Sequence, residues 1–459
     1  MEVLDEVRGD FVGNELGAQG GLGGFLSRCV RGDGEIRFVE QTSRLPCHEG
    51  GGAYRRRLQR MTPFLRKILG MNWVLVFVMY GLLIFGVFMI ESAARHLWVS
   101  KEQLAQYGSA GAYYAAMQKQ WILFGSVAFF GAALVDYRWI RWLGIPFYFL
   151  SLGLMAKAML EDDSVHRLTV MGFKFQPAQL GVASGIILIA WLLQSLPKAH
   201  RWFGSPFSRI VIIGGVAAVP FLMVMKMGDM GSALVWIPVA IVALLVGGAP
   251  FRYLSFMGFL AAGFLPLLYF VALPLVSERG PERIDTWLRM MRGQEVNIAD
   301  EGYAPHNISM AVGKAGWKGV GWKASAEQGS LHAKGFIPRD TAHNDYIFAV
   351  IAEEMGFRGS LLLLTAFALL MILGLFIAFY SRDVCGRVLA SLVVALFFAH
   401  VFESIGMCVL ILPITGIPMP LVSYSGTFVV ICMALLGLVQ SVWIHRNAKP
   451  ELPIKASAD

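Results

Sequence analysis

The sequence predicts an all-α polytopic membrane protein of about ten transmembrane helices, with a long extracytoplasmic loop between the seventh helix and the eighth. Hydrophobic residues make up 56% of the chain and charged residues only 15%, with a mean hydropathy of +0.59. Soluble globular domains do not have this composition. Apolar runs of about 20 residues, the length that crosses a ~30 Å hydrocarbon core, recur from Trp73 to the C-terminal region.

Ten apolar runs define the predicted spans. They cover residues 72–92, 120–136, 143–160, 174–195, 208–226, 231–248, 253–277, 345–379, 386–412 and 421–444. A cluster of cations precedes the first span, namely Arg55, Arg56, Arg57, Arg60, Arg66 and Lys67. Because positive charge in short segments stays cytoplasmic, we expect the N-terminus inside, and the tenth span returns the C-terminus to the same side.

These spans divide the chain into three parts. Residues 1–60 are rich in Gly and Arg and have no sustained apolar period, which indicates a flexible cytoplasmic tail. Residues 61–446 form the predicted transmembrane domain, and residues 447–459 a cytoplasmic tail. The loop, about 278–343, is basic although it lies outside; it is either plainly solvated or recognises phosphate or anionic lipid head groups. Nucleic acid is not expected as a partner.

Glycine and proline mark close packing and interrupted helices. Gly181 and Gly185, four residues apart, allow membrane helices to approach closely. Four loop glycines indicate tight turns or close packing: Gly313, Gly316, Gly319 and Gly321. Pro413, Pro418 and Pro420 interrupt the apolar run between the last two spans. Irregular backbone at membrane depth is tolerated only where it is buried in protein or lines a cavity.

Ionisable residues in or near the spans indicate either buried pairs or a functional cavity. They form three groups, Lys226 with Asp229, His400 with Glu403, and Glu353 with Glu354. Charged side chains are expensive in a membrane, so they need partners or a function. For Glu353, Glu354 and Glu403 the simpler interpretation is pairing with each other or with loop arginines, which fixes helix packing.

Asp345 differs from these residues because it lies at the water-accessible end of the eighth span, beside His343 and below a basic loop. At about 1.5 Å per residue, Glu353 and Glu354 are expected ~12 Å deeper along the same helix, out of reach of a substrate. A carboxylate near a helix start is either a simple N-cap or a catalytic group. The residues alone leave both interpretations open.

Cysteine and histidine give no clear metal site. None of the five cysteines lies in the loop, so no disulfide framework is implied. His306, His332 and His343 share the loop, but scattered loop histidines seldom bind a metal. No organic cofactor is predicted.

Several sequence blocks resemble the shape, elongation, division and sporulation family that contains RodA and FtsW. They are Gly302-Tyr-Ala-Pro-His-Asn-Ile-Ser309, Gly313-x-x-Gly-Trp-x-Gly-x-Gly321, His343-Asn-Asp-Tyr-Ile-Phe-Ala-Val-Ile-Ala-Glu-Glu-Met-Gly356, Phe175-Gln-Pro-Ala-Gln179 and the run from Leu412 to Gly426. The resemblance covers about residues 72–446 and is closer to RodA than to FtsW.

This resemblance implies a peptidoglycan glycosyltransferase of the bacterial cytoplasmic (inner) membrane. Such an enzyme polymerises lipid II into glycan strands on the outer face, during cell-wall elongation and shape maintenance. It works among membrane lipids with a class B penicillin-binding protein and other elongation-complex proteins. The motif aspartate that matches Asp345 is the proposed catalytic residue of the family.

The implied mechanism assigns roles to further residues. Asp345 would act as general base toward the GlcNAc 4-hydroxyl of one lipid II, which attacks the anomeric carbon of another and displaces undecaprenyl pyrophosphate. Cations would neutralise this leaving group; the candidates for substrate binding are Arg167, Arg283, Lys323, Arg339 and His343. Mg²⁺ or Mn²⁺ is a further candidate, although no ligand set is visible. The candidates for structural support of the site are Asp229, Glu353, Glu354, Glu403 and Ser423.

The chain departs from the family pattern at several positions, and two other functions are left open. The family usually has Glu and Lys where this chain has Gln179 and Val182, and Trp where it has Leu168. Losing both members of a buried charge pair can be nearly neutral, which favours a substituted structural pair. The alternatives are a lipid II flippase or transporter that uses intramembrane charges such as Glu403, and a catalytically weakened scaffold that activates the transpeptidase partner.

Overall fold

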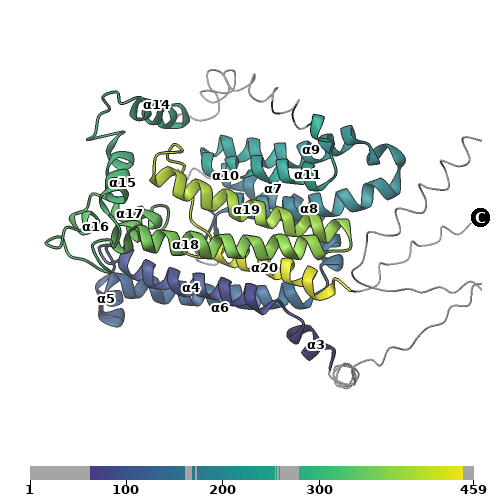
Figure 1. The fold of residues 1–459 in the computed structure, drawn as a ribbon, viewed down its shortest axis with the longest axis horizontal. Coiled ribbons are helices and arrows are strands. Elements are labelled where there is room, and N and C mark those ends of the chain that lie inside the picture. Colours follow the sequence, from purple (N-terminus) through teal and green to yellow (C-terminus); the bar gives the residue numbers. More distant parts are fainter. Residues whose placement is uncertain are drawn as a thin grey trace, which may run out of the picture. The chain divides into compact units, whose positions relative to one another are not determined.

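The computed structural model describes residues 62–160, 168–170, 173–253, 255, 258 and 279–447. Long helices lie side by side in a bundle, and three short helices gather at one end of it, which we call the loop end (Figure 1). These short helices are α15 (Tyr303–Lys314), α16 (Leu331–Lys334) and α17 (Arg339–Ala342). The predicted N-terminal tail, and the predicted C-terminal tail beyond Asn447, lie outside the described residues.

Apolar helices of membrane length make up most of the bundle. The long helices are α4 (Trp73–Ala93), α6 (Ala110–Leu134), α7 (Tyr137–Leu160), α8 (Pro177–Ala199), α9 (Pro206–Lys226), α18 (Ile347–Tyr380), α19 (Val384–Cys408) and α20 (Thr427–His445). The shorter elements are α3 (Pro63–Leu69), α5 (Lys101–Tyr107), η1 (Arg201–Gly204), α10 (Met230–Leu234), α11 (Trp236–Val246) and α14 (Arg279–Met291). Seven described helices are long and apolar enough to cross a membrane. This confirms the predicted polytopic all-α class.

Three details differ from the predicted spans. The second span, 120–136, is part of a helix that begins already at Ala110. The sixth, 231–248, is divided into α10 and α11. A small antiparallel hairpin pairs β1 (Leu168–Val170) with β2 (Phe173–Phe175) just before α8. The predicted seventh span, 253–277, falls almost wholly outside the described residues.

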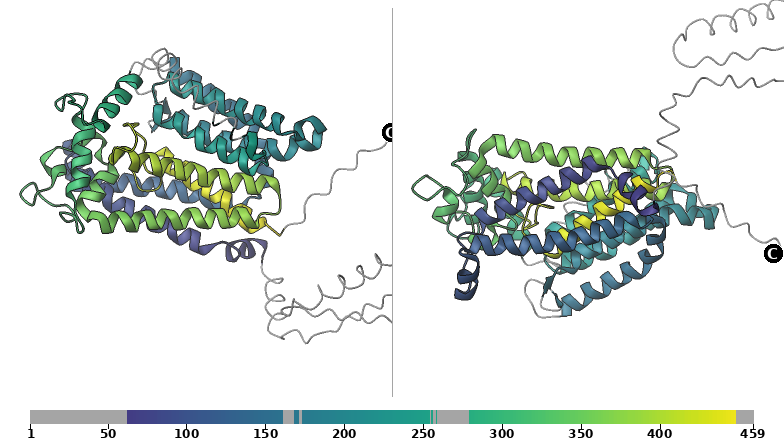
Figure 2. Two further views of the ribbon diagram at one scale, coloured as in Figure 1. Left: turned by 45° about the horizontal axis from the view of Figure 1, so that its top comes forward. Right: turned by 90° about the horizontal axis from the view of Figure 1, so that it is seen from below.

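α8 shows how small residues bring helices together in this bundle. A Cβ atom at Gly181 would lie 3.0 Å from Met155 Sδ on α7, and one at Gly185 would collide with the Trp236 ring on α11. Because lipid tails are as apolar as the helices, such close packing against small residues is a main source of packing energy in membranes. The packing role predicted for these glycines is confirmed. Elsewhere α20 lies along α6, and α18 along α19 (Figure 2).

Candidate active site

Between α19 and α20, residues 409–426 form an irregular segment inside the bundle. Its backbone passes α4 so closely that a Cβ atom at Gly86 would lie 2.8 Å from the Cα atom of Val422. Ser423 holds the segment: its hydroxyl accepts a backbone N–H of the segment at 2.9 Å and donates to the Asn344 carbonyl at 2.6 Å. Irregular backbone persists at membrane depth because its polar groups find such partners.

Asp345 lies in a turn, residues 343–346, that packs against this irregular segment. A Cβ atom at Gly416, whose φ is +75°, would lie 3.5 Å from Asp345 Oδ2, so the carboxyl group faces backbone that carries no side chain. α18 begins at Ile347, and Tyr346 occupies its N-cap position without a side-chain capping hydrogen bond. Asp345 therefore precedes the cap, and the N-cap interpretation does not describe its position.

The depths predicted for the acidic residues of this motif are reversed. Ser92, near the loop end of α4, donates a hydrogen bond of 2.5 Å to Glu354 Oε1. The irregular segment, which is bonded to Asn344, instead meets α4 at Gly86. Six residues of helix separate these two levels of α4, about 9 Å at 1.5 Å per residue. Asp345 thus lies deeper in the bundle than Glu354.

The reversal has a physical cause at Gly356. This residue has φ 68° and ψ −165°, so the helical segment from Ile347 leads back to the loop end before the chain turns and descends. Trp317, Lys318 and Gly319 of the loop lie so close that a Cβ atom at Gly356 would be 2.6 Å from the Trp317 carbonyl oxygen. Only glycine tolerates this conformation and this approach.

Backbone N–H groups of the loop hold Glu353 and Glu354, the two glutamates that precede Gly356. The carbonyls of Glu353 and Glu354 accept from Val320 N (2.9 Å) and Gly321 N (3.0 Å). The Glu353 carboxylate also accepts the backbone N–H of Leu331 and, at 3.2 Å, that of His332. Both glutamates therefore join the loop to the bundle, and neither lines the cavity beside the Asp345 turn.

Asp229 lies at the start of α10, which packs on the irregular segment: a Cβ atom at Gly231 would be 3.1 Å from Thr415 Cβ. Asp229 caps α10, where Oδ1 accepts a backbone N–H at 3.0 Å, and its Oδ2 accepts from Gln176 Nε2 at 2.6 Å. Burial raises the pKa of Asp229, while these hydrogen bonds and the positive charge of Arg283 oppose the rise. Glu403 of α19 lies near enough for its charge to interact with Asp229, and among the described residues its buried Oε2 has no hydrogen-bond partner.

The missing family charge pair is replaced by neutral contacts. Gln179 Nε2 donates to Ser232 Oγ at 3.1 Å, and Val182 is packed in the apolar core with 1% exposure. Neither substitution leaves an unpaired charge at this position. The arrangement is therefore a substituted structural pair, as the sequence favours.

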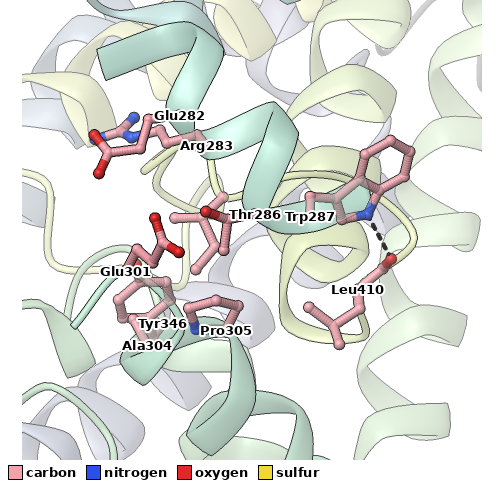
Figure 3. Close-up of a pocket in the computed structure, with 10 residues that line it drawn as sticks. Glu282, Arg283, Thr286, Trp287, Glu301, Ala304, Pro305, Tyr346 and Leu410 are labelled. Carbon is pink, nitrogen blue, oxygen red and sulfur yellow. Dashed lines mark hydrogen bonds between the residues drawn. The ribbon is translucent and has the colours of Figure 1, made fainter. Parts of the chain in front are cut away.

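A cavity of about 310 Å³ opens beside the Asp345 turn (Figure 3). Trp287 Nε1 donates to the Leu410 carbonyl at 2.8 Å and so ties α14 to the irregular segment. Arg283, one turn earlier on α14, lines the cavity and acts electrostatically on both Tyr346 and Asp229. The other residues that line it are Glu282, Thr286, Glu301, Ala304, Pro305, Tyr346 and Ile414. Arg283 is thus a cation of the cavity wall whose charge also acts on Asp229.

The other predicted cations lie elsewhere. Lys323 forms an ion pair with Glu91 (2.6 Å) and lies over the Trp322 ring, where it joins the loop to α4. Arg339 is exposed and folds over Gly335. Neither lines the cavity. Arg167 lies outside the described residues.

His343 is not a cation in this structure. Its ring is 8% exposed and packs against Tyr114 at 4.9 Å and Tyr424 at 5.4 Å between ring centroids. Burial lowers the pKa of His343 to about 4, so it is neutral at physiological pH. Its carbonyl accepts from Tyr424 N at 3.0 Å. His343 therefore positions the turn that carries Asp345 and offers no positive charge to a phosphate.

A protein-only metal site does not fit the part of the chain described here. Within it, no three or more His, Cys, Asp or Glu side chains are arranged to hold a metal ion. Mg²⁺ is commonly bound through one or two carboxylates together with substrate phosphates. A carboxylate such as Asp345 or Asp229 would hold Mg²⁺ in that mode only together with oxygen ligands from a substrate.

Sequence reasoning missed the cavity residues Glu282, Trp287 and Glu301. For Glu282 and Trp287 the available signal was the helical spacing of charged and apolar residues in 279–291, which is typical of an amphipathic helix. That pattern predicts a helix with one buried face. It does not show that this helix packs against α15 and the irregular segment.

The chain is similar to known proteins over most of its length. Residues 72–448 match the family profile of FtsW, RodA and SpoVE, described as cell cycle proteins. Peptidoglycan glycosyltransferase MrdB of Escherichia coli (strain K12) is 34% identical over 309 residues, 67% of this chain and 79% of that protein. Probable peptidoglycan glycosyltransferase FtsW of Geobacter metallireducens is 25% identical over 84% of this chain and 98% of that protein.

Two solved structures share the fold. A chain from a peptidoglycan synthase complex that coordinates polymerization and crosslinking has a TM-score of 0.65 and 22% identity, with 83% of this chain and 99% of that chain covered. Rod shape determining protein RodA of Thermus thermophilus has a TM-score of 0.55 and 22% identity, with 83% and 98% covered. Together with the apolar helices, these similarities show a multi-pass membrane protein.

Proposed function

Because the chain belongs to the FtsW, RodA and SpoVE family of cell cycle proteins, we propose that it is a peptidoglycan glycosyltransferase that polymerises lipid II during cell-wall elongation. The name and the 34% identity of MrdB support this activity and the elongation branch. The protein would lie in the bacterial cytoplasmic membrane with both termini inside and the loop end of the bundle outside, as the cation cluster before the first span favours.

The observation that carries the proposal is the position of Asp345. It lies in a turn against irregular backbone, beside a cavity at the loop end, and it is not a helix cap. Glu353 and Glu354, in the same motif, are held by loop N–H groups and by Ser92. These contacts of the glutamates support Asp345 as the carboxylate of this motif that meets a substrate.

In the proposed reaction, the Asp345 carboxylate accepts the proton of the acceptor 4-hydroxyl as its oxygen attacks the anomeric carbon of the donor. The bond from that carbon to the pyrophosphate breaks, and the undecaprenyl pyrophosphate leaves with the bonding electrons. A single displacement inverts the configuration. The Arg283 guanidinium would stabilise the charge that develops on the leaving group, because a fixed cation in a site shielded from water acts strongly.

Two further components belong to this proposal. Mg²⁺ or Mn²⁺ would share the pyrophosphate charge, with Asp345 or Asp229 among its ligands. A class B penicillin-binding protein would crosslink the new strands, which the similarity to a chain of the peptidoglycan synthase complex supports.

The test is polymerisation of purified lipid II by the protein in complex with its penicillin-binding protein. Moenomycin is included to silence contaminating polymerases of the other class, and EDTA tests the cation. We expect long glycan strands that persist under moenomycin and decrease with EDTA. No strands from an intact complex would contradict the proposal and favour the scaffold alternative.

A further inference from the structure

The cavity beside Asp345 contains polar groups that have no partners within the protein. Arg283, Glu282 and Glu301 make no hydrogen bond or ion pair within the described residues. The side chains of Thr286 and Tyr346 are more than nine-tenths buried, at 5% and 7% exposure, yet their hydroxyl groups are also unbonded there. Buried polar atoms without partners also occur elsewhere in the described residues, such as Glu354 Oε2 and Glu403 Oε2. The hydroxyl groups of Thr286 and Tyr346 differ from them because these residues line a cavity, where a ligand can reach them.

The charged residues of the cavity indicate which charge the ligand group carries. Arg283 acts electrostatically on Asp229 and Tyr346, and in the proposed function it stabilises a pyrophosphate. Glu282 and Glu301 then remain as two negative charges near an anionic substrate. Figure 3 shows both carboxylates on the same side of the cavity as the Arg283 guanidinium, away from Trp287. Glu282 is exposed and Glu301 half-buried, and with Arg283 they leave the cavity one net negative charge, which a positive group of a ligand would complement.

The apolar residues that line the rest of the cavity indicate what kind of positive ligand group fits there. Trp287, Pro305 and Leu410 present apolar surface, and Trp287 uses its indole N–H internally on the Leu410 carbonyl. A volume of about 310 Å³ is far larger than a metal ion requires and holds a side chain of several carbons. An aliphatic chain would pack on the apolar wall while its end reaches the carboxylates, as lysine side chains do on protein surfaces.

We propose that this cavity binds a primary ammonium group on an aliphatic chain, supplied by the diamino acid of the lipid II stem peptide. The inference rests on the proposed function and adds a specificity site to it. Glu282 and Glu301 are its specificity residues, and neither is placed at the reacting atoms.

The experiment compares two lipid II forms, one with lysine at the third peptide position and one with the same lysine N-acetylated, which removes the charge but keeps the chain. We expect the wild-type complex to have a KM about tenfold lower for the amine form, since a hydrogen bond to a charged group is worth roughly a factor of ten. In the double variant Glu282→Gln, Glu301→Gln, the ratio of the two KM values should fall to about one. Glu295→Gln, an exposed residue of the same loop, should keep the wild-type ratio.

Each other outcome has a distinct meaning. If the wild type polymerises neither lipid, the proposed function itself fails. If it polymerises both with the same KM, or if the double variant keeps the preference, the function stands and the ammonium site is refuted. If added Mg²⁺ restores the double variant on both lipids equally, the carboxylates hold a metal ion and the ammonium proposal is also refuted. The thermal midpoint of the double variant shows whether it is folded.

Discussion

The Asp345 turn and the Glu353–Glu354 contact lie in one sequence motif, yet they are built in opposite ways. Around the glutamates, backbone N–H groups of the loop and the Ser92 hydroxyl approach the carboxylates. Beside Asp345 lie backbone without side chains and a cavity with unpartnered polar groups. The glutamate contacts join the loop to the bundle, whereas the Asp345 turn lies next to a cavity that can admit a ligand. Sequence proximity does not distinguish the two.

Gly356→Ala should disrupt the glutamate contact most strongly. The new Cβ atom would lie 2.6 Å from the Trp317 carbonyl oxygen, in backbone with φ 68°. Strain and overpacking together predict a loss of about 3 kcal/mol or more, which a thermal unfolding midpoint in detergent would reveal. Gly313→Ala is the matched control, because a Cβ atom there meets nothing within 4 Å. Equal midpoints for both variants would refute the close contact.

Arg283→Ala should impair the other region without unfolding it. Removal of a cation that stabilises developing charge commonly lowers kcat by about 10²-fold. Lys323→Ala is the control, since its partly exposed ion pair with Glu91 is worth at most about 1 kcal/mol and lies outside the cavity. Initial rates of lipid II polymerisation would measure both variants. Similar rates for the two would remove Arg283 from the mechanism.

Low pH should destabilise the turn that carries Asp345, because His343 becomes protonated. The pKa of this residue is about 4 in the folded protein, against an ordinary value of 6.5 for a solvated histidine, because burial disfavours the imidazolium. The contribution of neutral His343 to the free energy of unfolding is therefore complete above pH 6.5. It is lost as the pH falls from 6.5 through 4, and the loss reaches about 2 kcal/mol near pH 5.

His343→Phe keeps an aromatic ring between Tyr114 and Tyr424 and cannot be protonated. Its midpoint should therefore depend less on pH between 7 and 5 than that of the wild type. A wild-type midpoint that does not change over this range would mean that His343 is not buried in the neutral form.

Much of the fold was predictable because it depends on local composition. Apolar runs between Trp73 and His445 predict membrane helices, and the prolines at 413, 418 and 420 predict the irregular segment that the structure contains. The depth of Glu354 was not predictable. It depends on the break in the helix at Gly356, where the backbone packs against Gly319, which is distant in the sequence.

The same limit applies to the candidate site. Asp345 could be selected from its motif, and Arg283 from the charge of the loop. The neutral state of His343 depends on two tyrosines from α6 and from the irregular segment, and the cavity depends on how α14 meets α15. Each of these features arises from tertiary contacts that no local pattern encodes.

The most direct test of the central claim is strand formation from lipid II by Asp345→Asn, with Asp340→Asn, an exposed change in α17, as the matched control. Asparagine keeps the size of the side chain and removes the base. We expect Asp340→Asn to polymerise like the wild type, whereas Asp345→Asn makes no strands although its thermal midpoint and partner binding are retained. Normal strands from Asp345→Asn would contradict a catalytic role.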